Sequence, residues 1–220
     1  MYIKKILLAI ALIGLVIAGY FAYFVYNAML KPNTAFNNET AYIYVPTNAT
    51  YEEVREQLEP LLKDIDSFDA LAVQKKYTTN IKAGRFPVKK GMSNNDIINS
   101  IRSNNLPIKL SFNNQERIED LAGRIAQQIE PDSLSLLKAM TDSTFLKEKN
   151  FTKQTVMNMY VPNTYEFFWN TSPELFRDKM LGEYYRFWND SRQAKRKALK
   201  LSVNEVMTIA SIVQKETAKV

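Results

Sequence analysis

The residue best placed for acid chemistry in this sequence is Glu216, a glutamate close to the C-terminal end. Apolar residues recur at helical spacing from Val203 to Val213 and predict an amphipathic helix, on which Glu216 projects between Ile209 and Ile212. Removal of water by these isoleucines would favour the protonated carboxyl group, which a general acid needs. A glutamate at the edge of the apolar stripe, with its stem packed and its carboxylate in water, fits the same spacing.

Residues 160–169 form a second candidate site, because five aromatic side chains surround a Pro-Asn turn in this stretch. The rings could stack on the C–H faces of a sugar, while Asn163 and Thr164 could hydrogen-bond its hydroxyl groups. A buried strand that follows a tight turn has the same residue pattern. The stretch therefore indicates either a glycan-binding loop or a strand of the core.

The composition limits the chemistry that these residues can carry out. The chain has no Cys and no His, which excludes thiolate nucleophiles, imidazole bases, Ser-His triads and zinc sites with Cys or His ligands. No cofactor and no metal are expected. The net charge is +6, and five basic residues lie between Arg192 and Lys200. A solvated helix face explains this basic run, and contact with a carboxylated glycan or an anionic lipid is the alternative. Nucleic acid is not an expected partner, because this part of the chain is predicted to lie outside the membrane.

The elements that must position these residues begin with a strand at 42–45, which alternates apolar and polar side chains. A turn follows it, and Thr50 with Glu53 forms a capping box for a helix. Ser67 is expected to cap a second helix. This part of the chain therefore predicts a small unit of strand, turn and short helices.

The same order of strand, turn and capped helix recurs further along the chain. A strand at 84–88 leads to a helix that Ser93 and Asp96 start, and a looser third unit begins with a strand at 108–112. Beyond Pro131 the pattern is mostly helical. The sequence therefore predicts an α+β fold, with a small first module and a mixed helical and strand domain after it.

The N-terminal residues 6–25 form an apolar segment without a charge. About 20 residues at 1.5 Å each match the roughly 30 Å hydrocarbon core of a bilayer. Lys4 and Lys5 precede the segment and resist translocation, which predicts a cytoplasmic N-terminus and an external remainder. A cleaved signal peptide is the alternative. Two observations speak against a signal peptide. The apolar segment is longer than the hydrophobic region of a signal peptide, which has about 7 to 15 residues, and the residues that follow it are bulky where a cleavage site needs small ones.

Three motifs together resemble the YceG-like family, the MltG-type endolytic murein transglycosylases. They are Ala-Ser-Ile-Val-Gln-Lys-Glu-Thr at 210–217, Val-Pro-Asn-Thr-Tyr at 161–165, and Lys-Ala-Gly-Arg-Phe at 82–86 with Gly-Met-Ser at 91–93. The order of anchor, LysM-like module and catalytic domain also resembles that family. On this basis we expect a cytoplasmic tail at 1–5, a transmembrane helix at 6–26, a linker at 27–40, a LysM-like module at 41–106 and a catalytic domain at 107–220.

The resemblance assigns the role of catalytic acid to Glu216. Many relatives carry an acidic residue two places earlier, where this chain has Gln214, and an amide cannot exchange the proton. The family continues past this glutamate, so the catalytic domain is expected to be incomplete here. The resemblance also assigns substrate binding to Asn163, Thr164, Tyr165 and Lys215.

The implied reaction is endolytic cleavage of the β-1,4 bond between N-acetylmuramic acid and N-acetylglucosamine in peptidoglycan, which leaves a 1,6-anhydro end and terminates or trims nascent strands. The expected partners are peptidoglycan glycan strands, the membrane and peptidoglycan synthases. The expected location is the inner (plasma) membrane, with most of the chain on the periplasmic side. The alternative is a membrane-anchored protein that binds peptidoglycan or scaffolds other enzymes without catalysis.

Overall fold

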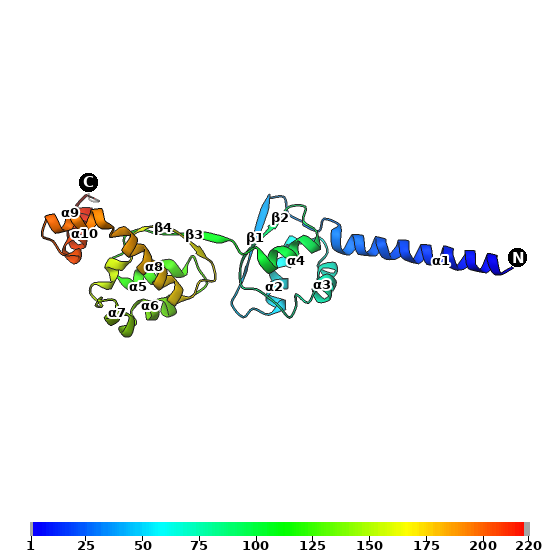
Figure 1. Cartoon of the computed structure of the whole chain (residues 1–220), viewed down its shortest axis with the longest axis horizontal. Helices are drawn as coiled ribbons and strands as arrows, with labels where there is room; N and C mark the ends of the chain where they lie inside the picture. The colour runs from blue at the N-terminus through cyan, green and yellow to red at the C-terminus, as the bar shows by residue number, and fades with distance from the viewer. Residues whose placement is uncertain (1, 218–220) are drawn as a thin grey trace. The chain divides into compact units, whose positions relative to one another are not determined.

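The computed structural model describes residues 2–217 and forms two compact units, Met1–Leu106 and Pro107–Val220 (Figure 1). Each unit has its own hydrophobic core and its own pair of antiparallel strands. The mixture of helices and strands that the sequence predicts is therefore confirmed.

The first unit begins with a long apolar helix, α1 (Tyr2–Val25). Within it, Ile6–Tyr23 has a mean hydropathy of 2.4, and none of this window is buried. Among residues 2–217, α1 is the one helix whose length and composition would let it cross a membrane. A π-helical turn, η1 (Tyr26–Leu30), follows α1 and contacts other helices of the same unit.

The elements of the first unit that follow η1 are β1 (Thr40–Val45), α2 (Tyr51–Leu58), η2 (Glu59–Leu61), α3 (Ile65–Gln74), β2 (Gly84–Lys89) and α4 (Asn94–Ser103). β1 and β2 pair in antiparallel register with Ile43 opposite Phe86, and both side chains are buried. Val54 of α2 and Ile97 of α4 complete this core with their neighbours. The alternation and helical spacing in the sequence thus place one apolar face of each element against the others.

The predicted capping boxes of α2 and α4 are both present. The predicted cap of the helix between them is wrong, because α3 begins at Ile65 and its N-cap is Asp64. The backbone N–H of Ser67 donates to Asp64 Oδ1 at 3.0 Å, so Ser67 lies in the first turn. An aspartate accepts this bond as well as a serine does, and the earlier start adds a turn whose apolar Ile65 packs against the core.

The elements of the second unit are β3 (Pro107–Phe112), α5 (Ile118–Ala126), α6 (Ser133–Met140), α7 (Ser143–Glu148), η3 (Val156–Met159), β4 (Asn163–Phe168), α8 (Pro173–Phe187), α9 (Asp190–Ala198) and α10 (Val203–Thr217). Figure 1 shows α5 to α8 on one side of the β3–β4 pair. The core of this unit joins Leu110 of β3, Leu121 of α5 and Phe176 of α8. β4 is the strand that the aromatic stretch forms.

Candidate functional site

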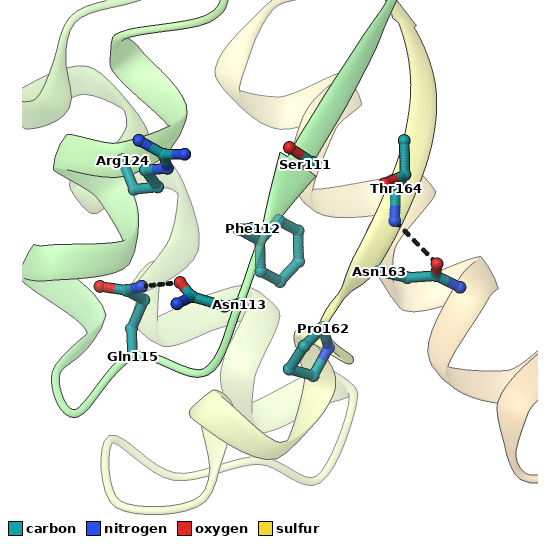
Figure 2. A pocket seen from close by; sticks show the side chains of 8 residues that line it. All are labelled: Ser111, Phe112, Asn113, Gln115, Arg124, Pro162, Asn163 and Thr164. Atoms are coloured by element: carbon teal, nitrogen blue, oxygen red, sulfur yellow. Dashed lines mark hydrogen bonds between the residues drawn. The ribbon is translucent and has the colours of Figure 1, made fainter. Parts of the chain in front are cut away.

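An open pocket of about 730 Å³ lies at the end of the β3–β4 ladder (Figure 2). Two of the predicted substrate-binding residues, Asn163 and Thr164 at the start of β4, line it. Polar side chains dominate its wall, and Phe112 and Pro162 provide apolar surface. The full lining comprises Ser111, Phe112, Asn113, Gln115, Arg124, Pro162, Asn163 and Thr164.

Strand pairing brings the two halves of this wall together. Ser111 lies opposite Thr164, and Phe112 lies opposite Asn163. On the other edge of β3, the Gln128 side chain completes the pairing: the Ser111 N–H donates to Gln128 Oε1 at 2.9 Å, and Gln128 Nε2 donates to the Ser111 carbonyl at 2.9 Å. The backbone at Ser111 is therefore held from both sides, which gives the pocket a rigid wall.

Tyr165, the third residue assigned to substrate binding in this stretch, lies behind the wall. Its ring is buried and stacks on Phe112, with 5.8 Å between the ring centroids. Its hydroxyl donates to the Val161 carbonyl at 2.5 Å, and burial raises the pKa of the phenol to about 12. Tyr165 therefore supports the turn that presents Pro162 and Asn163, and it is not among the lining residues.

The alternation along β4 reconciles the two interpretations of the aromatic stretch. Tyr165 and Phe167 point into the core, while Asn163, Thr164 and Phe168 are exposed. The stretch is a core strand on one face and a pocket wall at its first residues. Period-two alternation allows one strand to serve both purposes.

A polar loop between β3 and α5 forms the rim of the pocket. Gln115 Nε2 donates to Asn113 Oδ1 at 2.7 Å, and on the other side of the pocket the Thr164 N–H donates to Asn163 Oδ1 at 2.8 Å (Figure 2). Arg124, from α5, contributes the cationic group of the lining. Amides, hydroxyls and one guanidinium around this pocket can hydrogen-bond a polyhydroxylated ligand, and the exposed Pro162 ring adds apolar surface.

The same loop binds α10, the helix that carries Glu216. Lys215 Nζ forms an ion pair with Glu116 Oε1 at 2.9 Å, and Asn114 hydrogen-bonds Gln214. The hydrogen bond from Lys215 lowers the pKa of Glu116 below its ordinary value. Lys215, which the family resemblance assigns to substrate binding, therefore joins α10 to the pocket rim.

Glu216 follows Lys215 at the end of α10, and the prediction that Ile209 and Ile212 remove water from its carboxyl group is wrong. Ile209 and Ile212 are 48% and 58% exposed, Glu216 is exposed as well, and α10 buries none of its described residues. Polar contacts join α10 to the unit, including Asn158 Nδ2 to Asn204 Oδ1 at 2.9 Å. Helical spacing predicts which side chains share a face, but it does not say whether another element covers that face.

Sequence reasoning missed several residues of the pocket, Ser111, Asn113, Gln115 and Arg124, and also Glu116, which pairs with Lys215 beside it. The polar run that directly follows an apolar strand at Phe112 was a visible signal for the loop. Its proximity to the aromatic stretch depends on the β3–β4 pairing, which no local pattern shows. Among the described residues, no group of three or more Asp, Glu, Cys or His side chains could hold a metal ion.

Comparisons with known proteins agree with the motifs. The sequence profile of the YceG-like family matches residues 43–220. A crystal structure of a yceG-like protein from Listeria monocytogenes is similar at 20% sequence identity and a TM-score of 0.43, over 76% of this chain and 61% of that chain. No curated protein matches the chain. Because the family profile covers most of the sequence, this chain belongs to the YceG-like family, the MltG type.

Proposed function

We propose that this protein cleaves peptidoglycan glycan strands as a lytic transglycosylase, with Glu216 as its acid and base. One observation carries the proposal: the helix that bears Glu216 is joined, through Lys215 and Gln214, to the rim of a pocket whose wall suits a sugar. The family membership supports the same substrate class. The bond cut is the β-1,4 bond between N-acetylmuramic acid and N-acetylglucosamine.

A single carboxyl group is sufficient for this reaction. Glu216 donates its proton to the glycosidic oxygen as the bond to C1 of the muramic acid breaks, and the N-acetylglucosamine leaves as an alcohol. The carboxylate then accepts the proton of the C6 hydroxyl while O6 bonds to C1. This step closes the 1,6-anhydro ring and returns Glu216 to its protonated form. The attacking hydroxyl belongs to the same sugar and gains the advantage of an intramolecular reaction.

Pocket residues position the strand in this proposal. Phe112 and Pro162 offer apolar surface to one sugar face, while Asn163, Thr164 and Ser111 lie within reach of hydroxyl and acetamido groups. Because Glu216 is exposed, the bound glycan itself must exclude water from the carboxyl group.

Replacement of the carboxyl group tests the mechanism. In the full-length protein, Glu216→Gln removes the transferable proton and should reduce the release of anhydro-ended fragments by about a thousandfold or more, measured by mass spectrometry of digested glycan strands. Thr164→Ala should lower the rate by roughly tenfold, because it affects position and not proton transfer. Glu174→Gln, at an exposed carboxylate of α8 outside the pocket, is the control and should leave the rate unchanged.

The outcome also separates the alternatives. If Glu216→Gln cleaves at the control rate, the mechanism is wrong and a membrane-anchored binding or scaffolding protein becomes the better interpretation, which the exposure of Glu216 also favours. Products with reducing ends would indicate a hydrolase. A hydrolase normally needs a second carboxylate. Glu205, a candidate for it on α10, instead serves as part of the helix cap, because its carboxylate accepts from the Ser202 N–H at 2.6 Å.

We also propose that α1 anchors the protein in the inner membrane with its N-terminus in the cytoplasm. Lys4 and Lys5 on one side of the apolar window favour this orientation. A reporter enzyme fused after Lys31 should be active only outside the cytoplasm, and the intact N-terminus should be found by sequencing of the purified protein. A mature N-terminus near residue 30 would show a cleaved leader and contradict the anchor.

A further inference from the structure

Another pocket, of about 700 Å³, lies in the first unit at the point where the chain leaves the apolar helix. Its lining includes Asn27 of η1, Lys31, Lys63, Asp64, which is the N-cap of α3, and Asp66 in the first turn of α3. The glycan chemistry proposed above uses none of these residues. The pocket therefore requires an explanation of its own.

Buried hydrogen bonds build the floor of this pocket. Asn33 is 6% exposed, and its Nδ2 donates to the Asp64 carbonyl at 2.7 Å and to Asn94 Oδ1 at 2.6 Å, while its Oδ1 accepts from the Asp64 N–H at 3.0 Å. Asn94 Nδ2 in turn donates to Ser67 Oγ at 3.0 Å. This network fixes the segment after η1 to both α3 and α4. The positions from which Lys31 and Lys63 extend are therefore set before any ligand arrives.

The position of the pocket along the chain places it at a membrane surface. The apolar window of α1 ends at Tyr23. At about 1.5 Å per helical residue, Asn27 lies roughly 6 Å and Lys31 at most roughly 12 Å beyond that point. The headgroup layer on each side of a bilayer is about 5 to 8 Å thick. If α1 spans the membrane, Asn27 lies at the level of the lipid headgroups, and Lys31 lies between that level and roughly 4 Å outside it.

The charges of the pocket suit a ligand that carries both signs. Lys31 and Lys63 are exposed and offer ammonium groups, which bind phosphate diesters. Asp64 and Asp66 are exposed carboxylates on the α3 side, and Asp64 also caps the helix. Two lysines and two aspartates sum to no net charge, which matches a zwitterion better than an anion.

We propose that this pocket binds the headgroup of an aminophospholipid, with the phosphate diester near Lys31 and Lys63 and the primary ammonium group near Asp66. The occupant is a lipid of the leaflet that faces the first unit. Such a lipid would hold the first unit at a defined height and rotation above the membrane. The proposal rests on the anchor and is independent of any activity of Glu216.

Lipid retention by the full chain tests this assignment. The protein is placed in nanodiscs of phosphatidylethanolamine mixed with phosphatidylglycerol, and native mass spectrometry counts the lipids that remain bound after release. The wild type should retain phosphatidylethanolamine in preference to phosphatidylglycerol. Lys31→Gln with Lys63→Gln should lower that retention by roughly tenfold. Lys82→Gln with Lys89→Gln, which removes two exposed lysines of the same unit outside the pocket, should not change it.

A third variant tests the orientation of the headgroup. Asp66→Asn should remove the preference for phosphatidylethanolamine while phosphatidylglycerol is retained as before. Equal retention by the pocket and control variants would show that α1 alone holds the lipid. A wild-type preference for phosphatidylglycerol would also overturn the proposal.

Discussion

At the scale of single residues, Gly84 shows how a backbone requirement fixes an amino-acid type. It starts β2 with a φ of +145°, a backbone conformation that residues with a Cβ atom rarely adopt. A Cβ atom built on it would lie 2.4 Å from Asn105 Cγ. That asparagine cannot easily move, because its Oδ1 accepts from the Arg85 N–H at 3.0 Å. Gly84 therefore has both a conformational and a steric reason to be glycine.

Gly84→Ala should lower the free energy of unfolding of the first unit by about 2 to 4 kcal/mol, from backbone strain and the clash together. Gly91→Ala separates these contributions, since Gly91 also has a positive φ, of +82°, but has nothing within 4 Å of a built Cβ. It should cost about 1 kcal/mol. Urea denaturation followed by circular dichroism measures both values. Equal losses for the two variants would mean that the contact with Asn105 is unimportant.

At the scale of elements, the connection between α10 and the pocket rim is the contact on which the proposed function depends. α10 begins with a capping box, in which the Glu205 N–H donates to Ser202 Oγ at 3.2 Å, so its start is fixed locally. Its far end is held by the Lys215–Glu116 ion pair. Because the hydrogen bond from Lys215 lowers the pKa of Glu116, this pair is present at neutral pH and is lost only as the pH falls below the ordinary range of a glutamate.

A charge exchange tests whether Lys215 positions α10 or binds substrate. Lys215→Glu should lower the cleavage rate by about tenfold, because it repels Glu116 and displaces the helix that carries Glu216. Adding Glu116→Lys restores the pair with reversed signs and should recover most of the rate. Lys200→Glu, at an exposed lysine between α9 and α10, is the control for charge alone. A double variant as slow as the single one would instead support direct contact of Lys215 with the glycan.

At the level of the whole protein, each of the two units has a hydrophobic core of its own. The first has a core of its own, around Phe68, Phe86 and Ile97, and needs no residue of the second to complete it. It also exposes two tyrosines of β1, Tyr42 and Tyr44, on the strand face away from that core. The Arg85 guanidinium lies 3.7 Å from the centroid of the Tyr42 ring. An aromatic surface with a cation beside it suits a carboxylated glycan, so we propose that the first unit binds the cell wall.

Residues 31–106, which include the Asn33 network, should fold when expressed alone, with a cooperative melting transition, and should sediment with purified cell wall. Tyr42→Ala should weaken this sedimentation by about threefold to tenfold. Val73→Ala, which truncates an exposed apolar side chain of α3, should not affect it. A chain without a melting transition would contradict the independence of the unit. A folded unit that stays in the supernatant would contradict only the wall-binding role.

The sequence by itself determined the features that depend on neighbouring residues. Hydropathy over 6–25 predicts α1, and the capping pairs Thr50–Glu53 and Ser93–Asp96 predict where α2 and α4 begin. Alternation predicts the strands. These features are local because a helix or a strand is defined by contacts a few residues apart, so composition and spacing are enough to find them.

The folded structure, and no local pattern of the sequence, shows which distant residues meet. It pairs Ser111 with Thr164, joins Asn114 to Gln214 across one hundred residues, and ties Asn33 to Asn94. It also decided that the apolar face of α10 is exposed, against the expectation for Glu216. Each of these outcomes depends on how whole elements pack, and the free energy of packing is a sum over many side chains that no single motif contains.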